Sequence, residues 1–415
     1  MDRAKPFDIP KREVWEAYKS VRANKGAAGV DGQSIADFEV DLTDNLYKLW
    51  NRMSSGSYFP PPVRRVDIPK GPGKSGTRPL GIPTVADRTA QMVVKRFLEP
   101  LVEPHFHRDS YGYRPGKSAL EAVGVARERC WRYDWVLDLD VKGYFDSIPT
   151  DLLMRAVRRH TDCPWVLLYI ERWLKAPVQM ADGSLIGRDT GTPQGGVISP
   201  LLANLFLHYT FDLWMQRNHP DIPFERFADD AICHCRSEEQ TRALRISLEQ
   251  RFTECGLTLH PEKTKIVYCK DDDRRGTYPD KKFDFLGYRF RPRLSRRRQG
   301  KFGVSFSPAA SDEALKRVRQ TVRSWSIPRR SDKSLNDLAN MFNCYIRGWI
   351  NYYGRYYKSA LYPTLRHIDI ILARWAHRKF KSLRGHQRRS RHWLDRIARR
   401  QPGLFAHWGL LQGHG

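Results

Sequence analysis

The spacing of apolar residues predicts helices in the first and last parts of the chain. Between residues 84 and 106 they recur at helical spacing, as Val93, Val94, Phe97, Leu98 and Leu101. Residues 237–256 form a second amphipathic helix, in which Ser237 and Gln240 fit a capping box and Gly256 ends the helix. Similar patterns predict helices at 11–58, 151–175 and 311–400, with breaks at 24–32 and 323–332.

Shorter apolar stretches predict strands in the middle of the chain. They lie at 133–145, 224–235, 257–269 and 282–290, and residues 59–83 contain two further β-like pieces among prolines and glycines. The order is therefore helices, then mixed strands and helices, then helices again. This order predicts an α+β fold, with a mixed centre between helical flanks.

Two of the predicted strands carry acidic residues at unexpected places. The stretch RFADDAICHC places Asp229 and Asp230 side by side in an apolar segment, and Asp138 and Asp140 share one face of the earlier strand. Burying such a charge without a partner costs about 2–7 kcal/mol. Neither segment supplies a basic residue at strand spacing that would face inward with the acids.

A divalent metal ion would offset this cost. Carboxylate oxygens favour a hard ion, Mg²⁺ or Mn²⁺, and two such ions about 3.5–4 Å apart serve phosphoryl transfer. The other interpretation is that ADD forms a hairpin tip and that its acids face water. On these residues alone, both interpretations stay open.

Three further segments fit a nucleotide site. Lys70, Lys74 and Arg78 lie among glycines, where they could hold a triphosphate, although the spacing is not that of a Walker loop. In TPQGG, Gln194 stands beside two glycines that let backbone approach a ligand closely. Phe145 follows Asp140 by five residues. Taken singly, these segments could equally be a solvated loop, a turn and a core aromatic.

Positive charge is concentrated in the last third of the chain. Residues 291–415 hold 28 Lys and Arg against 6 Asp and Glu, whereas residues 1–290 hold 44 against 40. The basic part also contains many aromatic residues, which suits phosphate contact combined with packing or base stacking. We therefore expect a folded nucleic-acid-binding region, rather than a disordered basic tail or a helix on a membrane surface.

Cysteine usage and hydropathy add two expectations. The seven cysteines are scattered, and Cys233-His234-Cys235 is too tightly spaced for a standard zinc site, so we expect these residues to pack in a core. No run of 18 apolar residues occurs. We expect a soluble intracellular protein without a membrane partner.

Together and in this order, the motifs resemble those of reverse transcriptases. The segments LDLDVKGYFDSI, GTPQGGVISPLLANLFL, RFADDAI, GLTLHPEKTKIV and FDFLGYRF are similar to successive fingers and palm blocks of that family. NKGAAGVDG and GTRPLGIPTVADRTAQ resemble the N-terminal part of enzymes encoded in bacterial group II introns. FNCYIRGWINYYGRYYKSALYPTLRHIDIILARWAHRKFKSLRG resembles their maturase region.

The resemblance implies a right-hand polymerase with fingers, a palm built on an antiparallel sheet, a helical thumb and a short basic C-terminal segment. It places an N-terminal extension and fingers at 1–135, the palm with interleaved finger helices at 136–292, the thumb or maturase region at 293–384 and the basic nucleic-acid-binding segment at 385–415.

The resemblance also implies residue roles. Asp140, Asp229 and Asp230 would form the catalytic and metal-binding set for two Mg²⁺ ions, with Mn²⁺ as an alternative, and Asp230 would be a helper beside the primer end. Lys70 and Arg78 would hold the triphosphate, Phe145 would exclude a 2′-hydroxyl, and Gln194 with Gly195 would contact the incoming nucleotide. Lys263 is a candidate general acid. Nucleic-acid contacts are assigned to Arg347, Arg355, Arg388, Arg389 and Arg391.

Two features depart from the family pattern. Phe227 replaces the usual tyrosine before ADD, and the cysteine pairs of an H-N-H endonuclease are missing, so we expect no such nuclease and a primer from another source. The implied protein is a bacterial cytoplasmic RNA-directed DNA polymerase. Its partners are group II intron RNA, a DNA target and primer, and deoxynucleoside triphosphates. It would also promote splicing and support intron mobility. The alternatives are a maturase active only in splicing, and a domesticated enzyme of DNA repair or phage defence.

Overall fold

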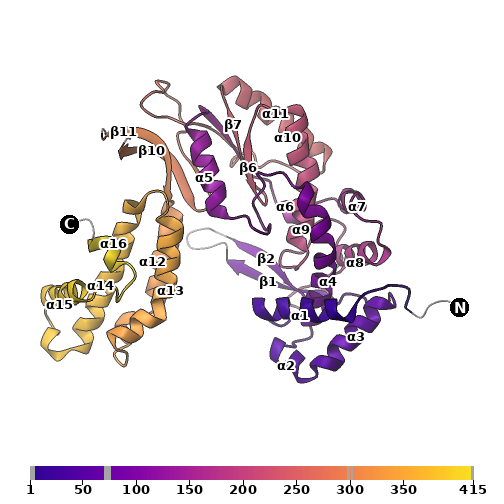
Figure 1. The fold of residues 1–415 in the computed structure, drawn as a ribbon, viewed down its shortest axis with the longest axis horizontal. Helices are drawn as coiled ribbons and strands as arrows, with labels where there is room; N and C mark the ends of the chain where they lie inside the picture. The colour runs from indigo at the N-terminus through magenta and orange to yellow at the C-terminus, as the bar shows by residue number, and fades with distance from the viewer. Residues whose placement is uncertain (1–4, 70–75, 297–299, 301, 413–415) are drawn as a thin grey trace. The chain divides into compact units, whose positions relative to one another are not determined.

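The computed structural model describes residues 5–69, 76–296, 300 and 302–412. Contacts between Cα atoms divide the chain into two compact units. The first unit contains residues 1–122 and 135–266, and the second contains residues 123–134 and 267–415. Each unit has both helices and strands, so the fold is a mixed α+β fold, as the sequence predicts (Figure 1).

Helices open the first unit. α1 (Lys11–Asn24) packs against α4 (Val85–Val102), and α3 (Leu42–Ser54) contacts both (Figure 1). α2 (Ile35–Val40) carries a full capping box at Ser34. The Thr84 side chain accepts a hydrogen bond from the Asp87 amide and caps α4. Phe97 and Leu101 are 39% and 41% exposed, so the buried stripe of α4 is narrower than predicted.

Two sheets complete the first unit. One has the strand order β2-β1-β4-β5, in which β1 (Val63–Pro69) and β2 (Thr77–Ile82) form an antiparallel pair. The other has the order β6-β7-β3-β8, and α11 (Glu238–Glu254) packs against β3 and β7. The elements of this part are β3 (Trp135–Leu139), β4 (Val178–Gln179), β5 (Leu185–Ile186), β6 (Phe224–Phe227), β7 (Asp230–Cys235), β8 (Lys265–Tyr268), α6 (Tyr144–Ser147), α7 (Thr150–Arg158), α8 (Pro164–Lys175), α9 (Ser199–Leu207), η2 (His208–Asp212), α10 (Leu213–Asn218) and η1 (Glu103–His105).

The second unit combines a three-stranded sheet with a helical bundle. The sheet order is β11-β10-β9, and β10 (Tyr288–Arg296) pairs along its whole length with β11 (Phe302–Ala310) (Figure 1). The bundle core is rich in aromatic residues, such as Trp325 stacked on Phe342, with ring centroids 4.2 Å apart. The remaining elements are β9 (Phe283–Phe285), α12 (Asp312–Ser324), η3 (Ile327–Arg329), α13 (Leu335–Tyr353), η4 (Lys358–Leu361), α14 (Tyr362–Lys379), η5 (Lys381–Leu383), α15 (Gln387–Arg400) and α16 (Trp408–Gln412). Both α5 (Ala119–Cys130) and β8 contain residues of both units.

All four strands predicted in the middle of the chain were too long, and the one at 257–269 is reduced to β8 (Lys265–Tyr268). The stretches 224–235 and 282–290 are hairpins, because each contains a turn with positive φ: 56° at Ala228 in the first, and 50° and 78° at Leu286 and Gly287 in the second. The strand predicted at 133–145 ends at Leu139, and α6 follows after a short turn. Apolar content predicts continuous strands over these stretches, but turns interrupt the strands.

Candidate active site

Asp229 lies in a two-residue turn at the tip of the β6–β7 hairpin. Phe227 pairs with Asp230, which leaves Ala228 and Asp229 between the strands. Asp229 is partly buried, whereas Asp230, the first residue of β7, is exposed. The two acids therefore lie in different environments. Of the two interpretations of ADD, the hairpin tip is confirmed, but Asp229 does not simply face water.

A buried arginine, Arg226, forms hydrogen bonds that fix this turn. The Arg226 side chain is 1% exposed, and it donates to both oxygens of the fully buried Asp212 at 2.7 and 2.6 Å. Its Nη1 also donates to Asn204 Oδ1 and to the carbonyl oxygen of Ala228, both at 3.0 Å. The guanidinium therefore fixes the carbonyl group of the residue that precedes Asp229. A charge buried in this way is tolerated because its hydrogen bonds are satisfied.

The turn is also held from its side. A Cβ on Gly112 would lie 2.3 Å from the Ala228 nitrogen, so the backbone at residue 112 passes close to the tip. The Asn204 amide donates to the Gly112 carbonyl at 2.5 Å, which ties this backbone to the same network as Arg226. Only glycine allows this approach without a shift of the backbone.

Asp140 belongs to the same site as Asp229. Leu139, the last residue of β3, pairs with Ala231 of β7, so Asp140 lies beside the hairpin tip. Burial raises the pKa of the Asp229 carboxyl, and the nearby Asp140 carboxylate raises it further. The Arg226 and Arg78 guanidinium groups act in the opposite direction. The ionisation of Asp229 is therefore influenced by one nearby carboxylate and two nearby cations.

Lys263 contacts Asp140 directly. Its Nζ lies 2.9 Å from Asp140 Oδ2, and this ion pair is partly open to solvent. The sequence excludes a basic partner of the acids only within the two strand segments, and Lys263 lies in neither of them. The partner comes from a segment far along the chain, which the spacing within a single strand could not reveal. The carbonyl of Asp140 accepts the His260 amide at 2.7 Å, and this bond anchors the same segment.

The site offers two carboxylates to a metal ion. Among the residues that the structure describes, no group of three His, Cys, Asp or Glu side chains could hold one. Mg²⁺ in proteins often takes one or two carboxylates and completes its shell with water and substrate phosphates. Asp140 and Asp229 fit this pattern. Their oxygens are hard donors, and a cation would offset the burial and the repulsion from Asp140 that raise the pKa of Asp229.

The predicted nucleotide-site residues meet where β2 contacts the TPQGG segment. The Thr192 amide donates to the Phe145 carbonyl at 2.8 Å, and the Gly81 amide donates to the Gln194 carbonyl at 2.6 Å. Gly195 has a φ of 113°, and a Cβ there would lie 2.3 Å from the Gly81 oxygen. The structure therefore brings Phe145, Gln194 and Gly195 together beside the strand that carries Arg78. Lys70 lies outside the described residues, as does Lys74.

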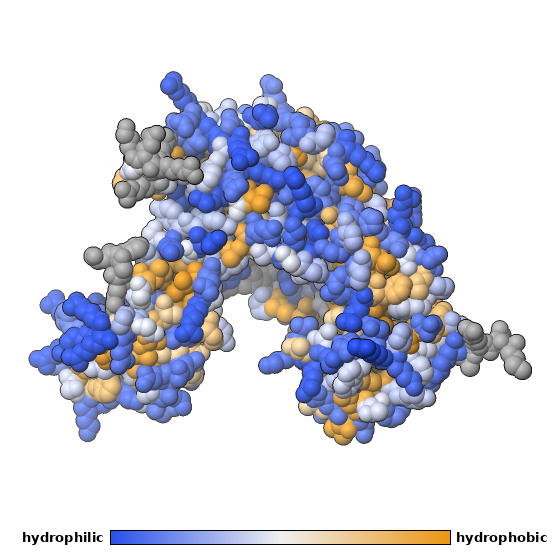
Figure 2. Space-filling view, viewed as in Figure 1, coloured by the Kyte–Doolittle hydropathy of each residue, from blue (hydrophilic) through white to orange (hydrophobic). Residues whose placement is uncertain are grey.

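The basic residues predicted for nucleic-acid contact lie on helices of the second unit or next to them. Arg347 is on α13, Arg355 follows this helix, and the other three are on α15; all five are exposed, namely Arg347, Arg355, Arg388, Arg389 and Arg391. Hydrophilic side chains cover much of the visible surface of this helical region (Figure 2).

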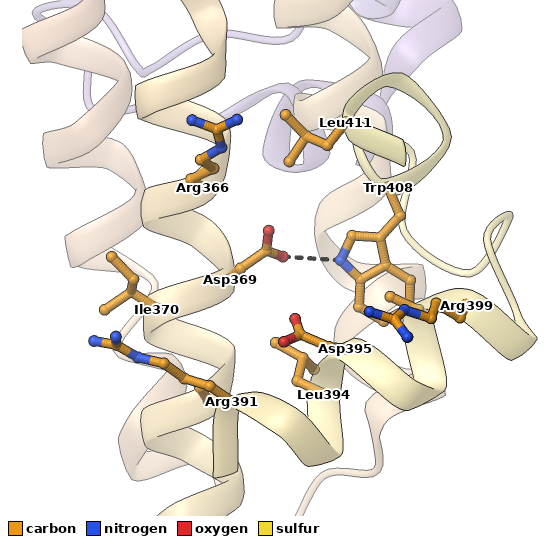
Figure 3. Close-up of a pocket in the computed structure, with 11 residues that line it drawn as sticks. Arg366, Asp369, Ile370, Arg391, Leu394, Asp395, Arg399, Trp408 and Leu411 are labelled. Atoms are coloured by element: carbon orange, nitrogen blue, oxygen red, sulfur yellow. Dashed lines mark hydrogen bonds between the residues drawn. The ribbon is translucent and has the colours of Figure 1, made fainter. Parts of the chain in front are cut away.

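Arg391 also lines a cavity of about 480 Å³ between α14, α15 and α16 (Figure 3). Asp369 forms one wall, where its Oδ1 accepts the Trp408 indole N–H at 2.8 Å and lies 2.8 Å from His407 Nε2. Two further arginines and a second aspartate surround the cavity, namely Arg366, Arg399 and Asp395. Its charges are therefore of both signs.

Sequence reasoning missed Arg226 as part of the site. A signal was present, since a charged residue inside an apolar strand needs a buried partner. The partner, Asp212, lies in η2, and nothing in the local pattern identifies it.

Comparison with known proteins agrees with this geometry. Residues 68–290 match the family model described as reverse transcriptase (RNA-dependent DNA polymerase), and residues 315–393 match the group II intron maturase-specific domain. The chain is 32% identical over 320 residues to Protein YkfC of Escherichia coli (strain K12). The aligned region covers 68% of this chain and 81% of that protein.

A second relative is the group II intron-encoded protein LtrA of Lactococcus lactis subsp. cremoris. The identity is 34% over 194 residues, which is 46% of this chain but only 32% of LtrA. A third is an uncharacterized 91 kDa protein in the cob intron of Schizosaccharomyces pombe, 25% identical over 87% of this chain and 52% of that protein. No described helix is long and apolar enough to cross a membrane.

The chain therefore belongs to the reverse transcriptase family, whose members are RNA-directed DNA polymerases. Within that family it is of the bacterial group II intron type, because a maturase-specific domain follows the polymerase domain.

Proposed function

We propose that this protein copies RNA into DNA by extending a DNA primer with deoxynucleoside triphosphates, and that it binds a group II intron RNA to promote splicing and mobility. One observation carries the polymerase proposal. Asp140 and Asp229 come from segments far apart in the sequence, yet the pairing of Leu139 with Ala231 brings Asp140 beside the hairpin tip, where its carboxylate raises the pKa of Asp229.

The proposed arrangement is that of a right hand. Residues 1–135, with the β1–β2 hairpin, would be the N-terminal extension and fingers. Residues 136–292 would be the palm, built on the sheet that holds the β6–β7 hairpin. Residues 293–384 would form the thumb, and residues 385–415, with α15, the basic segment.

Asp140 and Asp229 would hold the two Mg²⁺ ions, or Mn²⁺ in their place, with Asp230 as a helper near the primer end. When bound, such ions activate the attacking hydroxyl and stabilise the leaving pyrophosphate. Asp229 must be ionised for this, and burial opposes its ionisation. Arg226 and Arg78 lower the pKa of Asp229 and so favour the form that binds a cation.

The neighbouring residues would orient the nucleotide. Arg78, together with Lys70, would bind the triphosphate, and Gln194 with Gly195 would contact the incoming nucleotide. The Phe145 ring would lie under the sugar and exclude a 2′-hydroxyl. Lys263 is the proposed general acid for the leaving pyrophosphate, and the ion pair with Asp140 holds its ammonium group at the edge of the site.

Arg347, Arg355, Arg388, Arg389 and Arg391 would contact phosphates of the intron RNA or of DNA. Their exposure supports this proposal, as does the match of residues 315–393 to the maturase-specific domain. A maturase active only in splicing would not need the acids at the hairpin tip. A repair or defence enzyme would not need the maturase-specific domain.

Primer extension on an RNA template in Mg²⁺ tests the polymerase proposal. Asp229→Asn should abolish extension and leave RNA affinity within about twofold, because the substitution removes a metal ligand and no phosphate contact. The matched control is Asp162→Asn, at an exposed acid of the same unit, which should extend normally. Extension by the Asp229 variant at the wild-type rate would refute the assignment of this residue.

A further inference from the structure

A second basic site lies on the β10–β11 hairpin of the second unit. Because side chains alternate along a strand, Arg289, Arg291 and Arg293 share one face of β10. Tyr288 and Phe290, on the other face, are fully buried. The hairpin thus has an apolar side that packs on its own unit and a side that presents three guanidinium groups.

These arginines line a cavity of about 460 Å³. The other lining residues come from the segment before β9, from the end of β11 and the start of α12, and from η4 and the residue before it, and they are Lys282, Ala310, Asp312, Leu315, Tyr357, Ser359 and Ala360. Four cations therefore face one carboxylate. The cavity in Figure 3 differs, since its three arginines face two aspartates.

Only part of this positive charge is neutralised inside the protein. Arg289 is paired twice, with Asp284 at 2.7 Å and with Asp312. In contrast, Arg291 and Lys282 form no ion pair or side-chain hydrogen bond with any residue that the structure describes. Two full charges thus remain without a partner within the described chain.

Arg293 is held in place but not neutralised. Its Nε donates to the Ser307 carbonyl at 3.1 Å, its Nη2 donates to the Arg289 carbonyl at 3.2 Å, and the guanidinium lies over the Tyr357 ring. Burial, together with a smaller effect of the nearby Arg291, lowers the pKa of Arg293 to about 10. A fixed, half-buried cation beside a second cation provides the arrangement that a bound anion would stabilise.

We propose that this cavity binds backbone phosphate of a nucleic-acid strand, with Arg291 and Arg293 as the main contacts and Lys282 beside them. The site extends the nucleic-acid contacts of the proposed function to a stretch that neither family model covers, since the matched ranges end at residue 290 and begin again at residue 315. Tyr357 and Leu315 give the sugar next to the phosphate an apolar wall.

The test is the salt dependence of single-stranded RNA binding by the full chain. Each lost phosphate contact should flatten the slope of log K against log salt by about 0.7, so the double variant Arg291→Gln/Arg293→Gln should lose about 1.4. Asp312→Asn should act in the opposite direction, because it removes the only carboxylate among the described lining residues and one of the two ion-pair partners of Arg289. A merely structural role cannot produce opposite signs. The double variant Arg12→Gln/Arg217→Gln, at two exposed arginines of the first unit, is the charge-matched control.

Two outcomes would overturn the proposal. One is a double variant that melts like the wild type and keeps the wild-type salt slope. The other is a result in which inorganic tripolyphosphate raises the Tm of the wild type but not of the double variant, while the salt slopes of RNA binding are equal for both. The cavity would then bind free anions only. Both readouts are binding measurements, so they stand even if primer extension fails. Conversely, a wild-type salt slope in the double variant would not change the interpretation of Asp229→Asn in primer extension.

Discussion

Arginine side chains have opposite environments in two hairpins of this protein. On the β6–β7 hairpin, Arg226 is 1% exposed and all its bonds are made inside the first unit, to Asp212, Asn204 and the Ala228 carbonyl. On the β10–β11 hairpin, Arg291 is exposed and has no partner among the described residues. The same side chain is thus a structural support in one place and a free cation in the other.

The difference follows from the cost of desolvation. A buried charge must be paired inside the fold, so its removal leaves the partner unpaired and lowers stability. An exposed charge costs the fold little, and its energy becomes available when a phosphate displaces counterions. The comparison therefore predicts that substitutions in the first unit change stability and chemistry, whereas substitutions of exposed arginines in the second change the salt dependence of binding.

The largest effect is expected from Arg226→Gln. The substitution leaves Asp212 fully buried without its ion-pair partner, which costs about 3–5 kcal/mol of unfolding free energy. It also releases the Ala228 carbonyl, so Asp229 loses its fixed position. Denaturant unfolding should show the first effect. A raised Mg²⁺ requirement in primer extension should show the second, with partial rescue by Arg226→Lys.

Glu225→Gln is the matched control for this prediction. Glu225 is next in sequence and pairs with the buried His234 at 2.6 Å, on the same two strands but away from the turn. Its loss should lower stability without changing the Mg²⁺ requirement. If both variants shift the Mg²⁺ requirement equally, Arg226 has no special role in positioning the turn.

Asp87 should make stability depend on pH. The side chain is fully buried, and burial raises its pKa to about 6, although Tyr58, Trp173 and Gln91 donate hydrogen bonds to it. Because the folded pKa is raised, the stability that this group contributes is present at low pH and is lost as pH rises through about 6. The loss should be on the order of 2–3 kcal/mol between pH 4 and 7.

Unfolding of Asp87→Asn over the same pH range checks this expectation. The variant should lack that part of the pH dependence, whereas Asp162→Asn, at an exposed acid, should keep it. Parallel pH profiles of the wild type and the Asp87 variant would show that the carboxyl is not protonated in the folded state at pH 4–6.

Phe145→Ala tests a residue that acts by shape rather than by charge. Removal of the ring should admit ribonucleotides and lower the preference for deoxynucleotides by roughly 10- to 100-fold, because a steric contact of this size is worth about 1–3 kcal/mol. Competitive incorporation assays give the ratio of kcat/KM values. Tyr144→Phe is the control, because the neighbouring side chain is buried and its hydroxyl donates to the Ala203 carbonyl instead. Unchanged sugar selectivity in Phe145→Ala would remove this residue from the nucleotide site.

Periodicity predicted the elements well where one pattern extends over several turns. α11 follows its predicted cap, buried face and glycine end: Ser237 accepts from the Gln240 amide, and Leu244, Leu248 and Phe252 are buried. The reciprocal half of the capping box is different, since the Gln240 side chain accepts from Arg236 rather than from Ser237. Such local signals were sufficient for most helices.

The site was predictable only in part. The acids could be recognised because charge in an apolar strand demands an explanation, and Asp140 and Asp229 do meet. A hairpin tip at ADD was one of two interpretations, but the strand pattern alone could not decide for it, because alanine has no turn preference. The positive φ of Ala228 belongs to the two-residue turn that the pairing of Phe227 with Asp230 closes. Partners such as Asp212 and Lys263 depend on tertiary contacts, which periodicity does not encode.

The smallest effect on the fold is expected from neutralising α15. Arg388, Arg389 and Arg391 are exposed, so their joint replacement by Gln should change the unfolding free energy by no more than about 0.5 kcal/mol per residue. The same change should flatten the salt slope of single-stranded RNA binding by up to about 2, at about 0.7 per contact. Salt titrations of RNA binding, paired with denaturant unfolding, separate the two quantities. A lost slope with intact stability would complete the contrast with Arg226, whereas an unchanged slope would mean that α15 does not touch phosphate and that the exposed arginines of this unit are not equivalent.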